Sequence, residues 1–300
     1  MKKNDWIYYL LLVTSAALWG SSFIFTKQLL CSADPVTLIF SRVLIAGLLF
    51  LLLCLLFFRK DLKITRKDIP IVFAFSFFEP FLYFICETYS LTRCDASVVS
   101  IIVATIPIAT AFLSMFYFHE NFTKLNMFGV FVSFVGIFIM LFPAFASASI
   151  SVIGVILAFG AVGASVGYMF FLRKLPEHYN PVTIITYQNL IGLFLFAPLM
   201  FLITDKAEIS SQLQALAIAP NLYYLVSLAV LCSALAFMFY LQGMRRFGVG
   251  KANIFTNLIP IVTAVLSFFW LNEKFPLYKI LGIIIVIVGI FLVQKKTSKF

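Results

Sequence analysis

One stretch of the sequence occurs twice, and this duplication limits the folds that the chain can adopt. Ile106–Phe122 reads IPIATAFLSMFYFHENF, and Ile259–Phe275 reads IPIVTAVLSFFWLNEKF. Each copy continues into an apolar segment that ends in VGIF. Over Thr105–Phe138, fifteen of the 34 residues are identical to the residues 153 positions later. The chain is therefore built from two related units.

A second, weaker similarity extends the duplication toward the N-terminus of each unit. The segment PVTLIFSRVLIAGLLF from Pro35 is similar to PVTIITYQNLIGLFLF from Pro181. We therefore divide the chain into a first repeat over residues 1–146 and a second repeat over residues 147–300.

The composition places both repeats in a membrane. The 300 residues are 63% hydrophobic and 11% charged, whereas soluble domains carry about 25% charged residues. A membrane-spanning helix needs roughly 20 mostly apolar residues. Ten segments meet this requirement, at approximately residues 5–30, 35–58, 68–91, 95–118, 124–143, 150–173, 180–203, 219–244, 250–271 and 277–294.

The polar connections between these segments also carry structural signals. Asp34–Pro35 and Asn180–Pro181 are turn signals that come directly before apolar segments, and proline suits the first turn of a helix. The polar stretch Thr204–Gln214 is expected to form a short surface helix. We expect the first apolar segment to be a retained helix, because it continues past the length of a signal peptide.

Lysine and arginine residues are distributed unequally between the two sides of the predicted bundle. Sixteen lie in the segments on the side of the N-terminus, against three, Arg93, Lys206 and Lys274, on the opposite side. Cytoplasmic loops carry the excess of basic residues. The net charge of +10 therefore indicates topology rather than nucleic-acid binding, with both termini in the cytoplasm of a multi-pass cell-membrane protein.

The odd number of segments in each repeat has a topological consequence. Five helices per repeat place the second repeat upside down relative to the first. Inverted repeats are a recurrent plan of secondary transporters, with the binding site near the bilayer midplane between them. The expected fold is all-α and integral to the membrane, with ten transmembrane helices in two inverted five-helix repeats around a central cavity.

Three motifs in this order make the chain similar to a known family. They are ALWGSSFIFTK over Ala17–Lys27, SRVLIAGLLFLL over Ser41–Leu52, and the repeated P-x-x-T-x-x-x-S segment that ends at Glu120 and Glu273. Together they resemble the EamA-type members of the drug/metabolite transporter superfamily. The resemblance implies a cavity lined mainly by helices 1, 3, 4, 6, 8 and 9. It also implies secondary transport of small metabolites, often export of amino acids or related compounds.

The third apolar segment departs from the common family pattern, because it contains two glutamates. Glu79 lies near its middle, where an ionisable side chain is costly in a bilayer and marks function. Glu79, Tyr83 and Glu87 are spaced four residues apart, so a regular helix places them on one face. Pro80 is expected to kink this helix. We expect Glu79 or Glu87 to bind a cationic substrate group or to carry a coupling proton; the alternative is a structural acid bonded to a neighbouring helix.

Two basic residues, Arg42 and Lys27, are candidate partners for these acids. Either could pair with Glu87 or bind a substrate carboxylate. For Arg42 the structural ion pair is the favoured interpretation. For Lys27 it is snorkelling of the long side chain to the outer membrane interface.

Further aromatic and polar residues on the apolar segments are candidates for the cavity wall or for hydrogen bonds between helices. Gly20 and Ser22 favour close helix packing instead, since small residues let helices approach. The cavity candidates are Trp19, Tyr168, Tyr240, Gln242, Asn253 and Asn257.

Two pairs of equivalent residues in the duplicated stretch invite a structural interpretation. Pro107 and Pro260 are expected to bend their helices, so they are candidate hinges. Glu120 and Glu273 follow the last turn of each helix at a membrane face. We interpret these glutamates as turn and interface residues.

The sequence favours a secondary transporter that moves a small polar metabolite by alternating access, with export and proton coupling as further expectations. An exporter of cationic drugs, drawn by Glu79, is the alternative within transport. A membrane-embedded enzyme and a channel are alternatives of other classes, but the metalloprotease motif HExxH is absent from the sequence. We expect no cofactor or metal, because the five cysteines form no CxxC pair. The expected partners are a small-molecule substrate, the lipid bilayer and protons; neither a nucleic acid nor a protein partner is indicated.

Overall fold

A computed structural model describes residues 5–58, 63–117, 123–146, 151–175, 179–247, 252 and 255–294 of the chain. Within these ranges the chain forms helices and connecting turns, and no strand. The helices are α1 (Asp5–Leu29), α2 (Pro35–Phe57), α3 (Ile69–Ser76), η1 (Phe77–Leu82), α4 (Tyr83–Leu91), α5 (Ala96–Val103), α6 (Ile106–Tyr117), α7 (Lys124–Ala146), α8 (Val152–Leu172), α9 (Pro181–Ile203), α10 (Lys206–Ala217), α11 (Asn221–Val226), η2 (Ser227–Leu235), α12 (Ala236–Phe247), α14 (Ile259–Trp270) and α15 (Leu277–Gln294).

Seven helices of the described chain are long and apolar enough to cross a membrane. Several are continuous runs of the elements above, such as α3–η1–α4 and α11–η2–α12. The seven are Asp5–Leu29, Pro35–Phe57, Ile69–Leu91, Lys124–Leu141, Val152–Leu172, Pro181–Ile203 and Asn221–Phe247. They coincide with seven of the ten predicted segments. The fourth, ninth and tenth predicted segments correspond to shorter apolar helices, Ala96–Thr110, Ile259–Trp270 and Leu277–Leu292.

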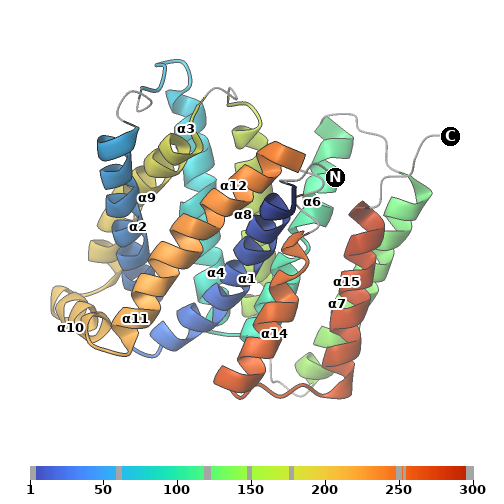
Figure 1. The fold of residues 1–300 in the computed structure, drawn as a ribbon. Coiled ribbons are helices and arrows are strands. Elements are labelled where there is room, and N and C mark those ends of the chain that lie inside the picture. The colour runs from blue at the N-terminus through green and yellow to red at the C-terminus, as the bar shows by residue number, and fades with distance from the viewer. Residues whose placement is uncertain are drawn as a thin grey trace.

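The helices lie side by side in one bundle, with α1 near its centre (Figure 1). We call the end at which α1 begins the Asp5 end, and the opposite end the Leu29 end. The short helix α10 lies at the Leu29 end (Figure 1) and confirms the surface helix predicted from the polar stretch. α7 and α15 form a pair at one edge, whereas α2, α3 and α9 lie at the other (Figure 1).

The two predicted turn signals, Asp34–Pro35 and Asn180–Pro181, lie at the beginnings of helices, as expected. Asp34 is the N-cap of α2, and its carboxylate accepts hydrogen bonds from the backbone N–H groups of Val36 and Thr37. Asn180 caps α9 in the same way, through Val182. These side chains satisfy backbone donors that have no partner within the first turn of a helix.

Two breaks in the helices occur at equivalent places in the repeats. The turn Ala104–Thr105 separates α5 from α6, and the turn Asn257–Leu258 precedes α14, 153 residues later. Each turn is followed at once by the next helix. The second residue of that helix is a proline, Pro107 or Pro260. The breaks divide the fourth and ninth predicted segments, which is why these helices are short.

A third break, at Glu79, interrupts the predicted third segment. The backbone of Glu79 is extended, with φ −145° and ψ 119°, between α3 and the remainder of η1. The expectation of a kink beside Pro80 is confirmed. The assumption of one regular helical face for Glu79 and its neighbours is wrong, because the chain leaves helical geometry at this residue.

α5 is buried along its whole length. All eight of its residues are buried, because α1, α4, α8 and α14 surround it. Its first residue follows Asp95 at the Leu29 end, and its last residue, Val103, faces the interior of the bundle. α5 therefore extends from that end of the molecule toward its centre.

The α7–α15 pair is built on glycines. A Cβ atom at Gly136 would lie 2.9 Å from the carbonyl oxygen of Gly282, and one at Gly289 would lie 2.7 Å from that of Gly129. Only residues without a Cβ permit backbones to approach this closely, which is a recurrent solution for helix contacts in membranes. Residues early in α7 contact residues late in α15, so the two helices are antiparallel.

Candidate functional site

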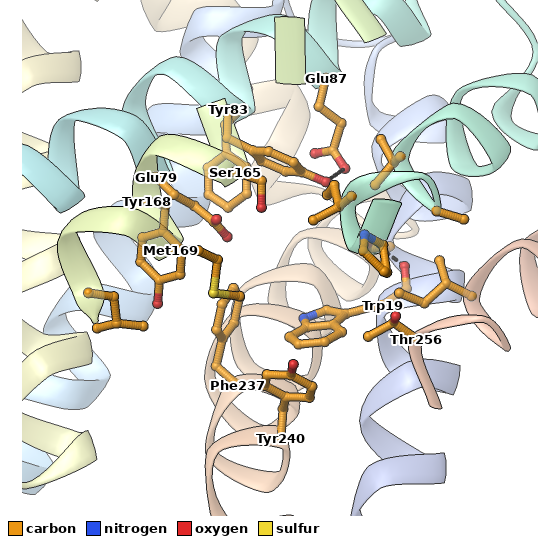
Figure 2. A pocket seen from close by; sticks show the side chains of 18 of the residues that line it. Trp19, Glu79, Tyr83, Glu87, Ser165, Tyr168, Met169, Phe237, Tyr240 and Thr256 are labelled. Carbon is orange, nitrogen blue, oxygen red and sulfur yellow. Dashed lines mark hydrogen bonds between the residues drawn. The ribbon is translucent and has the colours of Figure 1, made fainter. Parts of the chain in front are cut away.

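The centre of the bundle contains a cavity of about 120 Å³. Its wall is mostly aromatic and aliphatic, with a few polar and charged side chains among them (Figure 2). The lining residues are Trp19, Ser22, Phe23, Arg42, Glu79, Tyr83, Phe84, Glu87, Val103, Ala104, Ile106, Pro107, Ser165, Tyr168, Met169, Leu172, Phe237, Tyr240, Leu241, Met244, Thr256 and Ile259.

Glu79 occupies one wall of this cavity, where the break in the third segment aims its side chain inward. Figure 2 shows the carboxyl group in the space shared with Ser165, Tyr168 and Tyr83. Glu79 is 7% exposed and receives no hydrogen bond or ion pair from the described part of the chain. A buried carboxyl without a direct partner is costly, so this group is available to a ligand.

Glu87 differs from Glu79 in having a protein partner. The Tyr83 hydroxyl donates a hydrogen bond of 3.1 Å to Glu87 Oε1, and both residues are buried (Figure 2). The two residues are one turn apart on α4, as the four-residue spacing predicts. Both acids singled out from the sequence line the cavity, and the structure shows which of them is hydrogen-bonded to a described residue.

Arg42 lines the cavity from α2 and forms no ion pair with the described residues. Its Nε donates a hydrogen bond of 2.7 Å to the Ser233 hydroxyl, and its guanidinium lies 4.0 Å from the centroid of the Phe84 ring. The favoured structural ion pair with Glu87 is therefore wrong. The reason is that a hydroxyl and an aromatic ring hold the guanidinium in place of a carboxylate.

The aromatic part of the wall comes from α1, α4, α8 and α12. Trp19 contacts Phe237 and Tyr240 with ring centroids 5.0 and 5.1 Å apart. Tyr168 contributes from α8, where its ring packs edge-on against Phe75 at 6.0 Å. Trp19, Tyr168 and Tyr240 were all predicted as candidates, and the structure brings them to one cavity (Figure 2).

Other predicted site residues lie elsewhere. Gln242 is exposed, because the helical turn that directs Tyr240 inward directs Gln242 outward. Asn257 is buried beside the cavity residue Thr256 but does not line the cavity. Asn253 lies outside the described residues.

Lys27 is also remote from the cavity. It sits at the last turn of α1, where its Nζ donates to the carbonyl oxygens of Leu91 and Cys94, at 2.5 and 2.7 Å. It forms no ion pair with Glu87 in the described part of the chain. Two carbonyl groups, one at the end of α4 and one in the turn that follows it, accept its hydrogen bonds, and snorkelling to the outer membrane interface stays a prediction.

Several lining residues were not singled out from the sequence. Ser165, Met169, Phe237 and Met244 project into the cavity from α8 and α12, but apolar side chains face lipid and core equally in a membrane protein, so the pattern could not identify them. Ser22 was assigned to close helix packing and lines the cavity instead.

The small residue that does mediate close helix packing in α1 is Gly20. A Cβ atom at this position would lie 2.9 Å from the carbonyl oxygen of Ile259. The Thr263 hydroxyl also donates a hydrogen bond of 2.9 Å to the Gly20 carbonyl. The expectation for Gly20 is thereby confirmed, and α1 and α14 form a close contact beside the cavity.

Comparisons with known proteins agree with this architecture. The profile of the EamA-like transporter family matches residues 6–142 and, a second time, residues 152–294. The chain is 28% identical over 294 residues to the uncharacterized transporter YetK of Bacillus subtilis (strain 168), covering 96% of this chain and 87% of that protein. It is 25% identical over 296 residues to an uncharacterized transporter of Archaeoglobus fulgidus, covering 99% of this chain and 100% of that protein.

The fold itself also has a counterpart among solved structures. A crystal structure of another protein aligns with a TM-score of 0.66, covering 97% of this chain and 98% of the other, at 14% sequence identity. At this identity the likeness concerns the fold alone.

Proposed function

Because the chain belongs to the EamA-like transporter family, we propose that it is a secondary transporter that moves a small zwitterionic metabolite, an amino acid or related compound, by alternating access. The proposed direction is export, and the proposed coupling ion is the proton. A transporter of this family is a multi-pass membrane protein whose partners are a small-molecule substrate and the lipid bilayer.

The proposal includes ten membrane spans in two inverted repeats. The antiparallel α7–α15 contact supports this arrangement, since the two helices are the fifth of each repeat. Gly129 and Gly136 are the counterparts, 153 residues earlier, of Gly282 and Gly289. Each approaches the counterpart of the other, Gly136 with Gly282 and Gly129 with Gly289. A two-fold axis in the membrane plane produces this reciprocal pattern.

The substrate class rests on one observation: Arg42 and Glu79 line the same cavity, are both buried, and form no ion pair with each other or with another described residue. A buried charge needs a partner. A ligand with one carboxylate and one ammonium group supplies a partner to both charges. A purely cationic ligand leaves Arg42 without an anion.

The size of the cavity favours a small metabolite over a drug. A cavity of about 120 Å³ is slightly smaller than the roughly 150 Å³ cavity that holds benzene in another protein. Pockets for drug-sized ligands measure about 300–1,000 Å³. A multidrug exporter is therefore the weaker alternative for this conformation. A membrane-embedded enzyme is weaker still, since the family and its named relatives are transporters.

Counterflow in proteoliposomes tests the proposed function. Vesicles are loaded with an unlabelled compound, and uptake of the same labelled compound is measured for zwitterionic amino acids, for amines that lack the carboxylate, and for acids that lack the amine. We expect counterflow of the zwitterions alone. Counterflow of the amines at an equal rate would contradict a role of Arg42 in recognition and would support the cationic exporter.

A further inference from the structure

The turn between α4 and α5 is held from both sides by charged residues of distant segments. Lys27, from the end of α1, bonds to the carbonyl oxygen of Leu91 at the end of α4 and to that of Cys94 within the turn. Glu273, from the connection between α14 and α15, bonds to the beginning of α5 after the turn. Both anchors lie at the Leu29 end, and neither belongs to the central cavity.

The contacts of Glu273 replace the usual cap of a helix. Asp95 is the N-cap residue of α5, but its side chain makes no capping hydrogen bond. Instead, Glu273 Oε1 accepts a hydrogen bond of 2.7 Å from the backbone N–H of Ala96, and its Oε2 accepts one from the Ser97 hydroxyl. A carboxylate at a helix N-terminus satisfies free N–H groups and complements the helix dipole.

Lys279 completes this arrangement from the first turn of α15. Its Nζ lies 2.9 Å from Asp95 Oδ2 and 3.4 Å from Glu273 Oε2. The side chains of Lys279 and Glu273 are each 6% exposed, whereas that of Asp95 is 49% exposed. The acid and the base therefore fix each other in a nearly buried position, and Asp95 marks the solvent-accessible edge of the group.

Lys27 complements the C-terminal end of α4, as Glu273 complements the N-terminal end of α5. The last carbonyl groups of a helix lack N–H partners and carry partial negative charge. A cation that bonds to the carbonyls of Leu91 and Cys94 therefore stabilises the end of α4. The two anchors have opposite charges because the two helix ends that meet at the turn have opposite dipoles.

α5 is the barrier between this turn and the cavity. It begins after Asp95, is buried along all eight residues, and ends at Val103 and Ala104, which line the cavity. Eight residues of α-helix are about 12 Å long. No residue of the turn lines the cavity. In contrast, the lining includes Leu172 and Met244, which lie near the C-terminal ends of α8 and α12. α5 therefore occupies the space between the cavity and the turn at the Leu29 end.

We propose that Lys27, Glu273 and Lys279 form a latch that holds α5 closed across the Leu29 end of the cavity, and that release of this latch opens the cavity to that side. The turn at Ala104–Thr105 is the hinge about which α5 moves relative to α6. This inference concerns access to the cavity and does not depend on the identity of the substrate.

Side-specific cysteine labelling tests the latch without a transport assay. The five native cysteines are replaced by alanine or serine, and Ser22→Cys places a reporter in the cavity wall. A polar, membrane-impermeant maleimide is added on the side of the Leu29 end. A version that retains only Cys31, which is exposed at that end, verifies that the reagent reaches this side.

We expect Glu273→Gln to increase the labelling rate of the reporter about tenfold, because a helix cap and its charge-assisted hydrogen bonds are weakened. The matched control Glu208→Gln, on the exposed surface of α10, leaves the rate unchanged. An unchanged rate in folded Glu273→Gln protein would overturn the proposal.

Two further measurements separate opening of the latch from unfolding. A version that retains only the buried Cys54 must stay unlabelled in the Glu273→Gln background, and labelling of Cys54 as fast as the reporter would also overturn the proposal. If Glu273→Gln does not accumulate in the membrane, Lys27→Gln and Ser97→Ala replace it. We then expect about tenfold and threefold faster labelling, respectively, and unchanged rates in both would refute the latch.

Discussion

The charged side chains of the central cavity and those of the Leu29 end differ in how completely they are paired. In the cavity, Arg42 and Glu79 lie in one space and form no ion pair with the described residues. At the Leu29 end, Lys279 and Glu273 contact each other, and each makes further hydrogen bonds to the protein. The comparison indicates that incomplete pairing identifies charges available to a ligand, whereas complete pairing identifies charges that hold helices together.

The largest expected effect is on stability, at the fully paired charges. Lys279→Met leaves the nearly buried Glu273 without its cation, and breaking a buried ion pair from one side costs about 3 kcal/mol. Thermal unfolding of the purified protein in detergent measures this loss. The exposed neighbour Lys274 provides the control Lys274→Met, which we expect to be neutral. Equal stability of the two variants would show that the Leu29 end is not fixed by its charges.

The next effect is on recognition, at the unpaired cation. Arg42→Gln removes the proposed partner of the substrate carboxylate, and we expect zwitterion counterflow to fall about fiftyfold, or roughly 2.3 kcal/mol. Stability should change less than in Lys279→Met, since no ion pair is broken. The control is Arg66→Gln, at an exposed position. A folded Arg42→Gln protein with normal counterflow would mean that Arg42 is a structural residue.

The unpaired acid should separate binding from coupling. Glu79→Gln retains the shape of the side chain but cannot release a proton, so we expect pH-gradient-driven transport to be lost and counterflow to fall about tenfold, or roughly 1.4 kcal/mol. Transport with and without a pH gradient is compared in the same vesicles, with Glu208→Gln as the control. Survival of the pH-driven component would move the coupling role to Glu87.

A smaller effect is expected at the bonded acid. Tyr83→Phe removes the 3.1 Å hydrogen bond to Glu87 and should weaken substrate binding about fivefold, near 1 kcal/mol. Competition of unlabelled substrate with labelled uptake gives the affinity, and Tyr223→Phe, at an exposed tyrosine, is the control. A loss as large as that of Arg42→Gln would place Glu87 in direct contact with the substrate.

The smallest effect is expected at a position that the sequence assigned to the site. Gln242 is exposed, so Gln242→Ala should leave counterflow and stability within experimental error of the unmutated protein. A clear loss of transport would show that α12 rotates toward the cavity in another conformation.

The sequence predicted features that depend on local chemistry. Asp34 and Asn180 identified the beginnings of α2 and α9, because a capping side chain acts within its own first turn. Pro80 predicted the break in the third segment. The position of Glu79 in a long apolar segment marked it for the cavity. Seven of the ten predicted segments form helices that are long and apolar enough to cross a membrane.

The sequence could not predict features that depend on distant partners. Arg42 bonds to Ser233, which lies 191 residues later, so its ion pair was predicted wrongly. Glu273 caps a helix that begins 177 residues earlier, whereas the sequence led to its interpretation as a turn and interface residue. The exposed position of Gln242 was missed because apolar side chains occur on both the lipid-facing and the protein-facing sides of a membrane helix. The periodicity of the sequence therefore does not show which side faces outward.

The antiparallel α7–α15 contact also sets an order of assembly during synthesis. α7 ends at Ala146, and its glycine-rich partner begins at Leu277, so the ribosome must make the whole of the intervening chain before the two can meet. Until then, the close contacts of Gly129 and Gly136 with α15 cannot form. α15 therefore completes the packing of α7, and a chain truncated before α15 would leave the glycine-lined face of α7 without this partner.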